Sequence, residues 1–144
     1  MNFKPEEDIL EKYLSSKGLK NSQQRLDVLR VFLETEAHLT PEELHALVKK
    51  KFKTIGIATI YRTLKLLCNC GLAKELLLES GATRYEHSYG HNHHDHLICT
   101  QCGKVLEVID PEIEKLQEQL ARKHQFYTER HRMEIYGVCR QCKK

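Results

Sequence analysis

Four cysteines in the last third of the chain form two Cys-x-x-Cys pairs, Cys99 with Cys102 and Cys139 with Cys142. Thiolates at this spacing converge on one tetrahedral Zn²⁺, with bonds of about 2.3 Å, and leave no open position for water. Such a closed site stabilises a structure and does not catalyse a reaction. The sequence therefore predicts a structural zinc site formed by these four residues.

A histidine-rich run, residues 91–96, directly precedes the first cysteine pair. Imidazole and carboxylate ligands suit borderline or harder ions, for which exchange is easier and sensing becomes possible. If the run leads extended into a strand, its side chains alternate, with His94 and His96 on one side and His93 and Asp95 on the other. We expect this short segment to contribute to two different metal sites.

The composition is typical of a small soluble globular protein, with 144 residues, 40% of them hydrophobic and 30% charged. The N-terminal residues contain no apolar run resembling a signal peptide, and no stretch approaches the roughly 18 apolar residues that span a bilayer. We therefore expect a cytoplasmic protein with no membrane partner. In that compartment the six cysteines are expected to be thiols or metal ligands, because thiols are kept reduced there.

Positive charge is concentrated in the first half of the chain. Residues 17–74 carry eleven basic and five acidic side chains, whereas the formal net charge of the whole chain is only +3. A basic segment is compatible with phosphate binding, although a solvated face such as Lys49-Lys50-Lys51 is the commoner explanation. The fold has to decide between these two interpretations.

The first half is expected to form helices followed by a hairpin. Thr40-Pro41-Glu42-Glu43 forms a capping box with proline at the first helical position. Apolar residues at helical spacing predict four helices, and alternation then predicts two strands. The expected helices begin near residues 5, 22, 41 and 57, and the expected strands span residues 72–78 and 83–86.

This order of elements is the layout of a winged helix-turn-helix domain, with residues 58–70 as the recognition helix and the hairpin as the wing. Polar residues lie outside the apolar stripe of that helix, and they either contact DNA or form an ordinary solvated face. These residues are Thr59, Tyr61, Arg62 and Lys65.

Residues 87–92 are polar and are expected to form a hinge between a DNA-binding domain, residues 1–86, and a second domain, residues 93–144. The second half has strand patterns at residues 97–100, 105–109 and 126–138, with a helix starting at Asp110-Pro111. A core of about 50 residues is marginal without metal or oligomerisation. One face of this helix is either core or a dimer interface, and it carries Ile113, Leu116 and Leu120. The expected fold class is α+β, a winged helix-turn-helix domain followed by a small α/β dimerisation domain with a four-cysteine zinc site.

Several motifs in order along nearly the whole chain resemble the ferric uptake regulator (Fur) family of metal-dependent repressors, and iron-sensing members most of all. The motifs are Gly18-Leu19-Lys20 with Gln24-Arg25, Ile57-Ala58-Thr59-Ile60-Tyr61-Arg62-Thr63-Leu64, Thr83-Arg84-Tyr85-Glu86, His93-His94-Asp95-His96-Leu97-Ile98-Cys99 with Cys102-Gly103, and Glu134-Ile135-Tyr136-Gly137-Val138-Cys139.

The resemblance implies roles for particular residues. The four cysteines match the structural zinc ligands of the family. The regulatory Fe²⁺ site, which Mn²⁺ or Zn²⁺ can also occupy, matches His38, Glu86, His94, His96 and Glu107, and an additional metal site matches His93, Asp95, Glu114 and His131. Lys20 resembles a minor-groove lysine, and Tyr61 and Arg62 resemble contacts from the recognition helix, beside Thr59.

The resemblance implies a repressor of iron-uptake genes that is not an enzyme. As a homodimer, with pairing into a tetramer left open, it would bind a palindromic A·T-rich operator in double-stranded DNA when metal is bound. Metal held by ligands from both halves would fix the angle between them and shift the population towards the DNA-competent state. Glu86 and Glu107 favour iron sensing, because peroxide sensors of the family usually have Asp at these positions.

Other functions stay open at the level of the sequence. Peroxide sensing or zinc and manganese sensing would use the same fold. A zinc hydrolase could use His94, His96 and a carboxylate, with an open metal position for an activated water. A metal-buffering protein would bind metal with no preference for one DNA sequence.

Overall fold

The computed structural model describes residues 2–90 and 93–144. Its contacts divide the chain into two compact units, Met1–His91 and Asn92–Lys144, which we call unit 1 and unit 2. Residues 91 and 92, the end of the expected hinge, lie outside the described residues, and His87 at its beginning belongs to a strand. Among the described residues, no helix combines the length and the apolar character needed to cross a bilayer.

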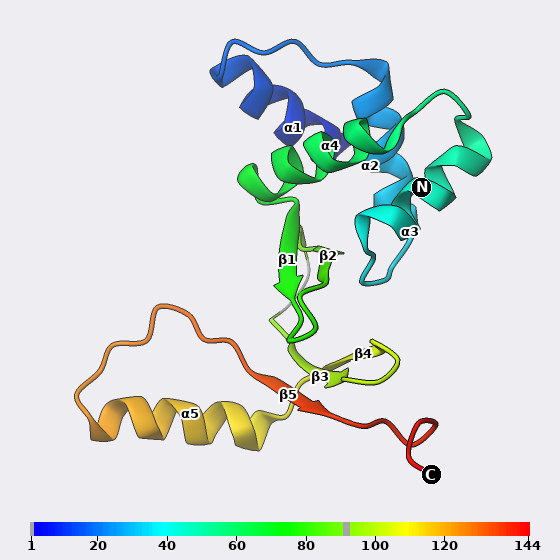
Figure 1. Ribbon diagram of the computed structural model, residues 1–144. Helices are drawn as coiled ribbons and strands as arrows, with labels where there is room; N and C mark the ends of the chain where they lie inside the picture. Colours follow the sequence, from blue (N-terminus) through cyan, green and yellow to red (C-terminus); the bar gives the residue numbers. More distant parts are fainter. Residues whose placement is uncertain (1, 91–92) are drawn as a thin grey trace. The chain divides into compact units, whose positions relative to one another are not determined.

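Unit 1 begins with four helices, and their order along the chain can be followed by colour in Figure 1. They are α1 (Lys4–Ser16), α2 (Gln23–Glu34), α3 (Pro41–Lys51) and α4 (Ile57–Asn69). The starts of α2 and α3 follow from local chemistry. Ser22 caps α2 by accepting a hydrogen bond from the backbone N–H of Arg25, and the predicted capping box between Thr40 and Glu43 is present at α3.

One hydrophobic core joins the four helices. It takes residues at helical spacing from each helix, so the amphipathic pattern of the sequence becomes the packing of the unit. Fully buried members include Leu10, Leu14, Val28, Leu29, Phe32, Leu44, Val48, Ile60, Leu64 and Leu67. Packing of this stripe leaves the opposite face of α4 exposed, which is the arrangement a recognition helix needs.

The hairpin predicted as the wing follows α4 directly (Figure 1). It pairs β1 (Ala73–Leu77) with β2 (Thr83–His87) in antiparallel register, with Ala73 opposite His87. Gly81 lies in the connecting turn at φ +85°, a conformation that favours glycine. The unit is therefore a winged helix-turn-helix.

Unit 2 contains a three-stranded sheet in the order β4-β3-β5. The central strand β3 (Asp95–Cys99) is antiparallel to β4 (Val105–Val108) and parallel to β5 (Glu134–Gly137). The parallel pairing sets Cys99 opposite Gly137. The two Cys-x-x-Cys pairs consequently lie at the same end of the sheet.

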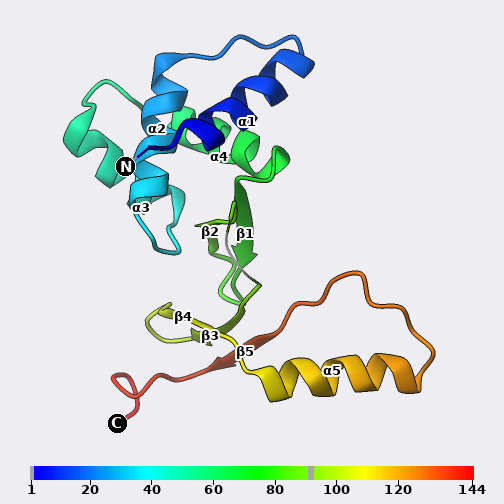
Figure 2. The same ribbon diagram turned by 180° about the vertical axis from the view of Figure 1, so that it is seen from behind.

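Helix α5 (Pro111–Lys123) connects β4 to the segment that leads back to β5, as Figure 2 shows from behind. No residue of α5 is buried, and Leu116 and Leu120 are 62% and 61% exposed. The alternative that placed the apolar face of this helix in the core is therefore wrong for the single chain. The predicted strand over residues 126–138 is too long, since the strand covers only Glu134–Gly137, and Phe126 and Tyr127 are exposed rather than packed on a sheet.

Candidate metal centres and DNA-binding face

The four cysteines of unit 2 lie together, with their sulfur atoms within 4.8 Å of one another. The Sγ atoms of Cys102 and Cys139 are 3.8 Å apart. That separation is far too long for a disulfide, but it matches the edge of a tetrahedron with metal–sulfur bonds of about 2.3 Å, which is about 3.8 Å. The arrangement thus fits a single Zn²⁺ held by four thiolates.

Electrostatics within this cluster favour a cation. Backbone N–H groups, that of Cys139 above all, lower the pKa of Cys99 to about 6. Hydrogen bonds with the neighbouring cysteine side chains, Cys139 first, raise the pKa of Cys142 to about 12. Four thiolates so close together repel one another, and a bound divalent cation removes that repulsion.

A second group of possible ligands gathers in unit 2 around His93 and Asp95. The Nε2 atom of His93 lies 3.4 Å from Asp95 Oδ1 and 3.4 Å from Glu114 Oε1, and His131 Nε2 lies 3.1 Å from the same Glu114 oxygen. Asp95 is 1% exposed, and neither carboxylate oxygen accepts a hydrogen bond from any described residue. A buried carboxylate in this condition is costly unless a cation neutralises it. The four side chains therefore fit a divalent metal ion.

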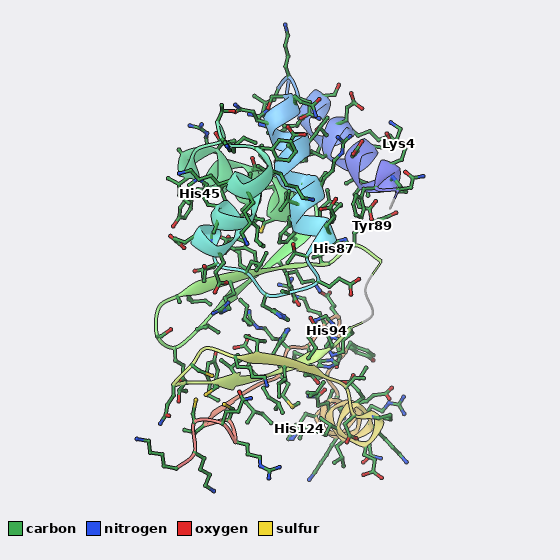
Figure 3. The ribbon with its side chains drawn as sticks, turned by 90° about the vertical axis from the view of Figure 1, so that its right-hand side faces the viewer. Lys4, His45, His87, Tyr89, His94 and His124 are labelled. Carbon is green, nitrogen blue, oxygen red and sulfur yellow. The ribbon has the colours of Figure 1, made fainter. Side chains whose placement is uncertain are left out.

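The other side of the same segment carries His94 and His96, as the predicted alternation requires. Their rings are 5.1 Å apart between centroids, and His94 Nε2 lies 3.6 Å from Glu107 Oε1. His96 faces Glu107 across the β3–β4 pairing. Figure 3 labels His94 beside the strands of this sheet. Unit 2 thus offers two imidazoles and a carboxylate in one place.

Unit 1 brings His38 and Glu86 together, although 48 positions separate them in the sequence. His38 Nε2 lies 2.9 Å from Glu86 Oε2, and both side chains are less than one tenth exposed. Between them, Leu39 and Tyr85 form an isolated antiparallel bridge through two backbone hydrogen bonds of 3.0 and 2.8 Å. The bridge joins the loop before α3 to the wing strand β2 and holds the pair in place.

The outer face of α4 carries the side chains predicted to contact DNA. Tyr61, Arg62 and Lys65 are exposed and Thr59 is half-buried, whereas Ile60 and Leu64 lie in the core. Lys20 is exposed in the loop before α2, and the guanidinium of Arg25 donates to its carbonyl oxygen at 2.7 Å. The fold therefore presents a helix and a separate lysine loop to solvent from the same unit.

Residues 16–136 match the Ferric uptake regulator family. The chain belongs to this family. It is 40% identical to the Ferric uptake regulation protein of Campylobacter upsaliensis over 93% of this chain and 88% of that protein. It is 33% identical to the Peroxide-responsive repressor PerR of Staphylococcus epidermidis over 91% and 86% of the two chains.

A solved structure of the Helicobacter pylori ferric uptake regulator Fur, described as revealing three functional metal binding sites, has the same fold. The two chains are 36% identical, the TM-score is 0.86, and the alignment covers 96% of this chain and 93% of that one. As a member of the Fur family, the chain is a metal-responsive transcription regulator.

Sequence reasoning missed the hydrogen bonds that Arg84 and Tyr61 make to the start of α3 and to the loop before it. Arg84 Nη1 donates to the His38 carbonyl oxygen at 2.8 Å and to Glu43 Oε2 at 2.9 Å. The hydroxyl of Tyr61 donates to Glu42 Oε1 at 2.6 Å. Arg84 lies in a motif of the Fur family and Glu43 in the capping box, but neither signal indicates these long-range partners.

Cys68 and Cys70 are half-buried beside the core of unit 1. Burial raises the pKa of Cys68 to about 12 and raises that of Cys70 as well, so both keep their protons near neutral pH. His45, labelled on α3 in Figure 3, donates from Nε2 to the carbonyl oxygen of Ile55 at 3.1 Å. These residues have structural surroundings rather than those of a metal site.

Proposed function

We propose that this Fur-family protein is an Fe²⁺-responsive repressor of iron-uptake genes that binds a palindromic A·T-rich operator as a homodimer. The observation that carries the proposal is the pairing of histidine with carboxylate in each unit, His38 with Glu86 and His94 with Glu107. No thiolate belongs to either pair. Nitrogen and oxygen ligands of this kind suit Fe²⁺ or Mn²⁺, whereas a zinc sensor would more often use cysteine.

One regulatory ion takes ligands from both units in this proposal. Unit 1 supplies His38 and Glu86, and unit 2 supplies His94, His96 and Glu107. The bound ion fixes the orientation of the winged-helix unit. The ion shifts the population towards the DNA-competent arrangement only by the difference in its affinity for the two states, and couplings of this kind are typically about 1–3 kcal/mol.

Glutamate at both regulatory positions, Glu86 and Glu107, favours iron sensing over peroxide sensing. Peroxide sensors of the family usually have aspartate at these positions. Zn²⁺ generally binds such ligands more tightly than Fe²⁺, so selectivity in the cell also depends on which metal is available. The similarity to a peroxide-responsive repressor supports a second candidate, in which oxidation of the iron site releases the DNA.

The two other metal groups have separate roles. The four cysteines hold a structural Zn²⁺ that completes the small core of unit 2. The set formed by His93, Asp95, Glu114 and His131 binds an additional divalent ion. The three sites described for the Helicobacter pylori protein support this division.

Dimerisation is supported by the apolar surface of unit 2. Leu116 and Leu120 on α5, Ile135 on β5 and Leu106 on β4 are all more than 40% exposed. A second copy of the chain covers these side chains in the proposed homodimer. A twofold dimer carries two recognition helices, so its operator is palindromic. Tyr61, Arg62 and Thr59 contact the major groove, and Lys20 contacts the minor groove.

The test is anaerobic DNA binding by the zinc-loaded protein at one fixed salt concentration, because phosphate contacts make affinity depend on salt. A palindromic A·T-rich duplex and a scrambled duplex are titrated with and without Fe²⁺, Mn²⁺ and Zn²⁺. We expect Fe²⁺-dependent binding that prefers the palindrome. Equal binding of both duplexes regardless of metal would favour a metal buffer, and irreversible loss of binding after brief H₂O₂ treatment would favour the peroxide sensor.

A zinc hydrolase is tested in the same preparation. That enzyme would use His94, His96 and a carboxylate as ligands and keep an open metal position for an activated water. The proposal predicts that the protein cleaves neither ester nor peptide substrates when excess Zn²⁺ is present, because it assigns these histidines to the regulatory ion.

A further inference from the structure

The first turn of α3 carries two adjacent carboxylates, Glu42 and Glu43, and each is engaged by a different part of unit 1. Glu43 Oε2 accepts from the backbone N–H of Thr40 at 2.9 Å and from Arg84 at 2.9 Å. Glu42 Oε1 accepts from the hydroxyl of Tyr61 at 2.6 Å. Glu43 therefore has a structural task, and Glu42 reaches the exposed face of α4.

The bond between Glu42 and Tyr61 is well suited to hold a side chain in place. A carboxylate in the first turn of a helix is stabilised by the helix dipole, and a hydroxyl–carboxylate bond of this length is strong. The bond lowers the pKa of Glu42 and raises that of Tyr61. At neutral pH the phenol is therefore the donor and Glu42 carries the negative charge.

The bond to Glu42 limits which part of Tyr61 can contact a ligand. Its side chain is 47% exposed, but its hydroxyl hydrogen is already donated to α3. With the hydroxyl bound, the aromatic ring is the part that can contact another molecule. In the major groove an aromatic ring meets the apolar C5-methyl group of thymine, whereas a hydroxyl would meet phosphate or a base edge. A fixed negative charge beside the ring also disfavours an approaching phosphate.

We propose that Glu42 is a positioning residue for DNA sequence recognition, which holds the hydroxyl of Tyr61 so that the ring of Tyr61 reads thymine methyl groups. The inference rests on the proposed function, in which α4 enters the major groove. It adds that specificity at the Tyr61 position depends on an acidic residue of the preceding helix. Glu42 itself contacts no base.

The test compares the palindromic A·T-rich duplex with the same duplex in which deoxyuridine replaces every thymidine, which removes the methyl groups. Both are titrated with Fe²⁺-loaded wild type, Glu42→Gln, Tyr61→Phe and the double variant. Wild type is expected to bind the duplex that contains thymidine more tightly than the duplex that contains deoxyuridine. Each single variant is expected to reduce this discrimination about fivefold, because Tyr61→Phe removes the bond and Glu42→Gln removes the acceptor charge that strengthens it. The double variant is expected to reduce it no further, because without the hydroxyl the acceptor has no effect.

Two controls keep the result specific. Glu34→Gln removes one carboxylate from α2, where it pairs with Lys51 at 2.5 Å, and it is expected to leave the discrimination unchanged. The phenolate titration of Tyr61, taken as wild type minus Tyr61→Phe, is expected to move to lower pH in Glu42→Gln. No movement of this titration would show that the bond is absent and would overturn the inference.

Other outcomes separate the inference from the proposed function. If Glu42→Gln and Tyr61→Phe reduce discrimination additively, or if Glu42→Gln does not change it, the inference fails and metal-dependent recognition stands. If Tyr61→Phe weakens binding equally to both duplexes, the hydroxyl contacts phosphate and the inference fails. If wild type shows no preference for the palindrome over the scrambled duplex, the proposed function fails and the inference fails with it.

Discussion

Arg84 donates a hydrogen bond from Nη1 to the carbonyl oxygen of His38, with 2.8 Å between the two atoms. Arg84 is two residues before Glu86 on β2, so both side chains emerge on the same face of the wing. The same nitrogen also binds Glu43 in the first turn of α3. The backbone at His38, one proposed metal ligand, is thus bound to β2, which carries another proposed ligand, Glu86. Through Arg84 it is also linked to α3, the helix before the recognition helix α4.

Loss of Arg84 is predicted to destabilise unit 1 even without metal. Arg84→Ala removes a charged donor from two acceptors, and we expect a loss of about 1–3 kcal/mol in the free energy of unfolding. Urea denaturation of metal-free protein, followed by far-UV circular dichroism, measures it. Arg30→Ala is the matched control, because the Arg30 side chain, which pairs with Glu7, is 44% exposed against 17% for Arg84, and a smaller loss is expected. Equal losses in both variants would contradict the role assigned to Arg84.

Cys102→Ser is predicted to abolish the structural zinc. Purified wild-type protein should hold one tightly bound Zn²⁺ per chain in this site, and the variant none, as measured by mass spectrometry under native conditions. Unit 2 should then lose cooperative thermal unfolding, because its sheet is small and the metal completes it. Cys70→Ser is the control, since Cys70 belongs to unit 1 and lies beside its hydrophobic core. Zinc retained by Cys102→Ser at wild-type affinity would refute the assignment of the four cysteines as its ligands.

Asp95→Asn is predicted to have opposite effects on the metal-free fold and on metal binding. The buried carboxylate accepts no hydrogen bond from a described residue, so a neutral isostere should raise the thermal midpoint of metal-free unit 2. The affinity for a divalent ion at this group should fall about tenfold or more. Calorimetric titration with Mn²⁺ measures the second effect. Asp110→Asn is the control, because Asp110 caps α5 and asparagine caps a helix as well as aspartate does. Unchanged Mn²⁺ affinity in Asp95→Asn would remove Asp95 from the site.

Cys68 is predicted to alkylate slowly near neutral pH. Burial raises the pKa of its thiol to about 12, so its thiolate fraction at pH 8 should be roughly a thousandfold below that of an ordinary cysteine of pKa about 9. Because the folded protein holds this proton more tightly than the unfolded chain, the stabilising contribution is present below about pH 9 and is lost as the pH rises further. Iodoacetamide labelling from pH 7 to 10, read by peptide mass spectrometry, tests the rate. Labelling at pH 8 as fast as in urea would contradict it.

Local chemistry made much of the fold predictable. The capping box at Thr40 and Glu43 and the apolar spacing of α2 and α4 were confirmed, because these signals act within a few residues. The end of the chain was less predictable. Alternation over residues 126–138 suggested a long strand, but pairing with β3 begins only at Glu134. Alternation alone cannot reveal where a strand finds its partner.

The candidate sites also differ in how much of each could be predicted from the sequence. Spacing alone indicated the cysteine cluster and the opposite sides of the His93–His96 segment. The pairing of His38 with Glu86, by contrast, depends on the Leu39–Tyr85 bridge, and only the family resemblance pointed to it. The bonds from Arg84 and Tyr61 to the start of α3 have no local signal, because their partners are 41 and 19 residues away.

The central claim is that one regulatory ion takes ligands from both units. The direct measurement is the Fe²⁺-dependence of operator binding, anaerobically and at fixed salt, for wild type, His38→Ala, His96→Ala and the double variant, with His124→Ala as the control. Fe²⁺ should tighten binding by wild type and His124→Ala about 10- to 100-fold. Each ligand variant should lose this dependence, and the double variant should behave like either single one. Full Fe²⁺-dependence in His38→Ala or in His96→Ala, or partial losses that add in the double variant, would contradict a shared ion.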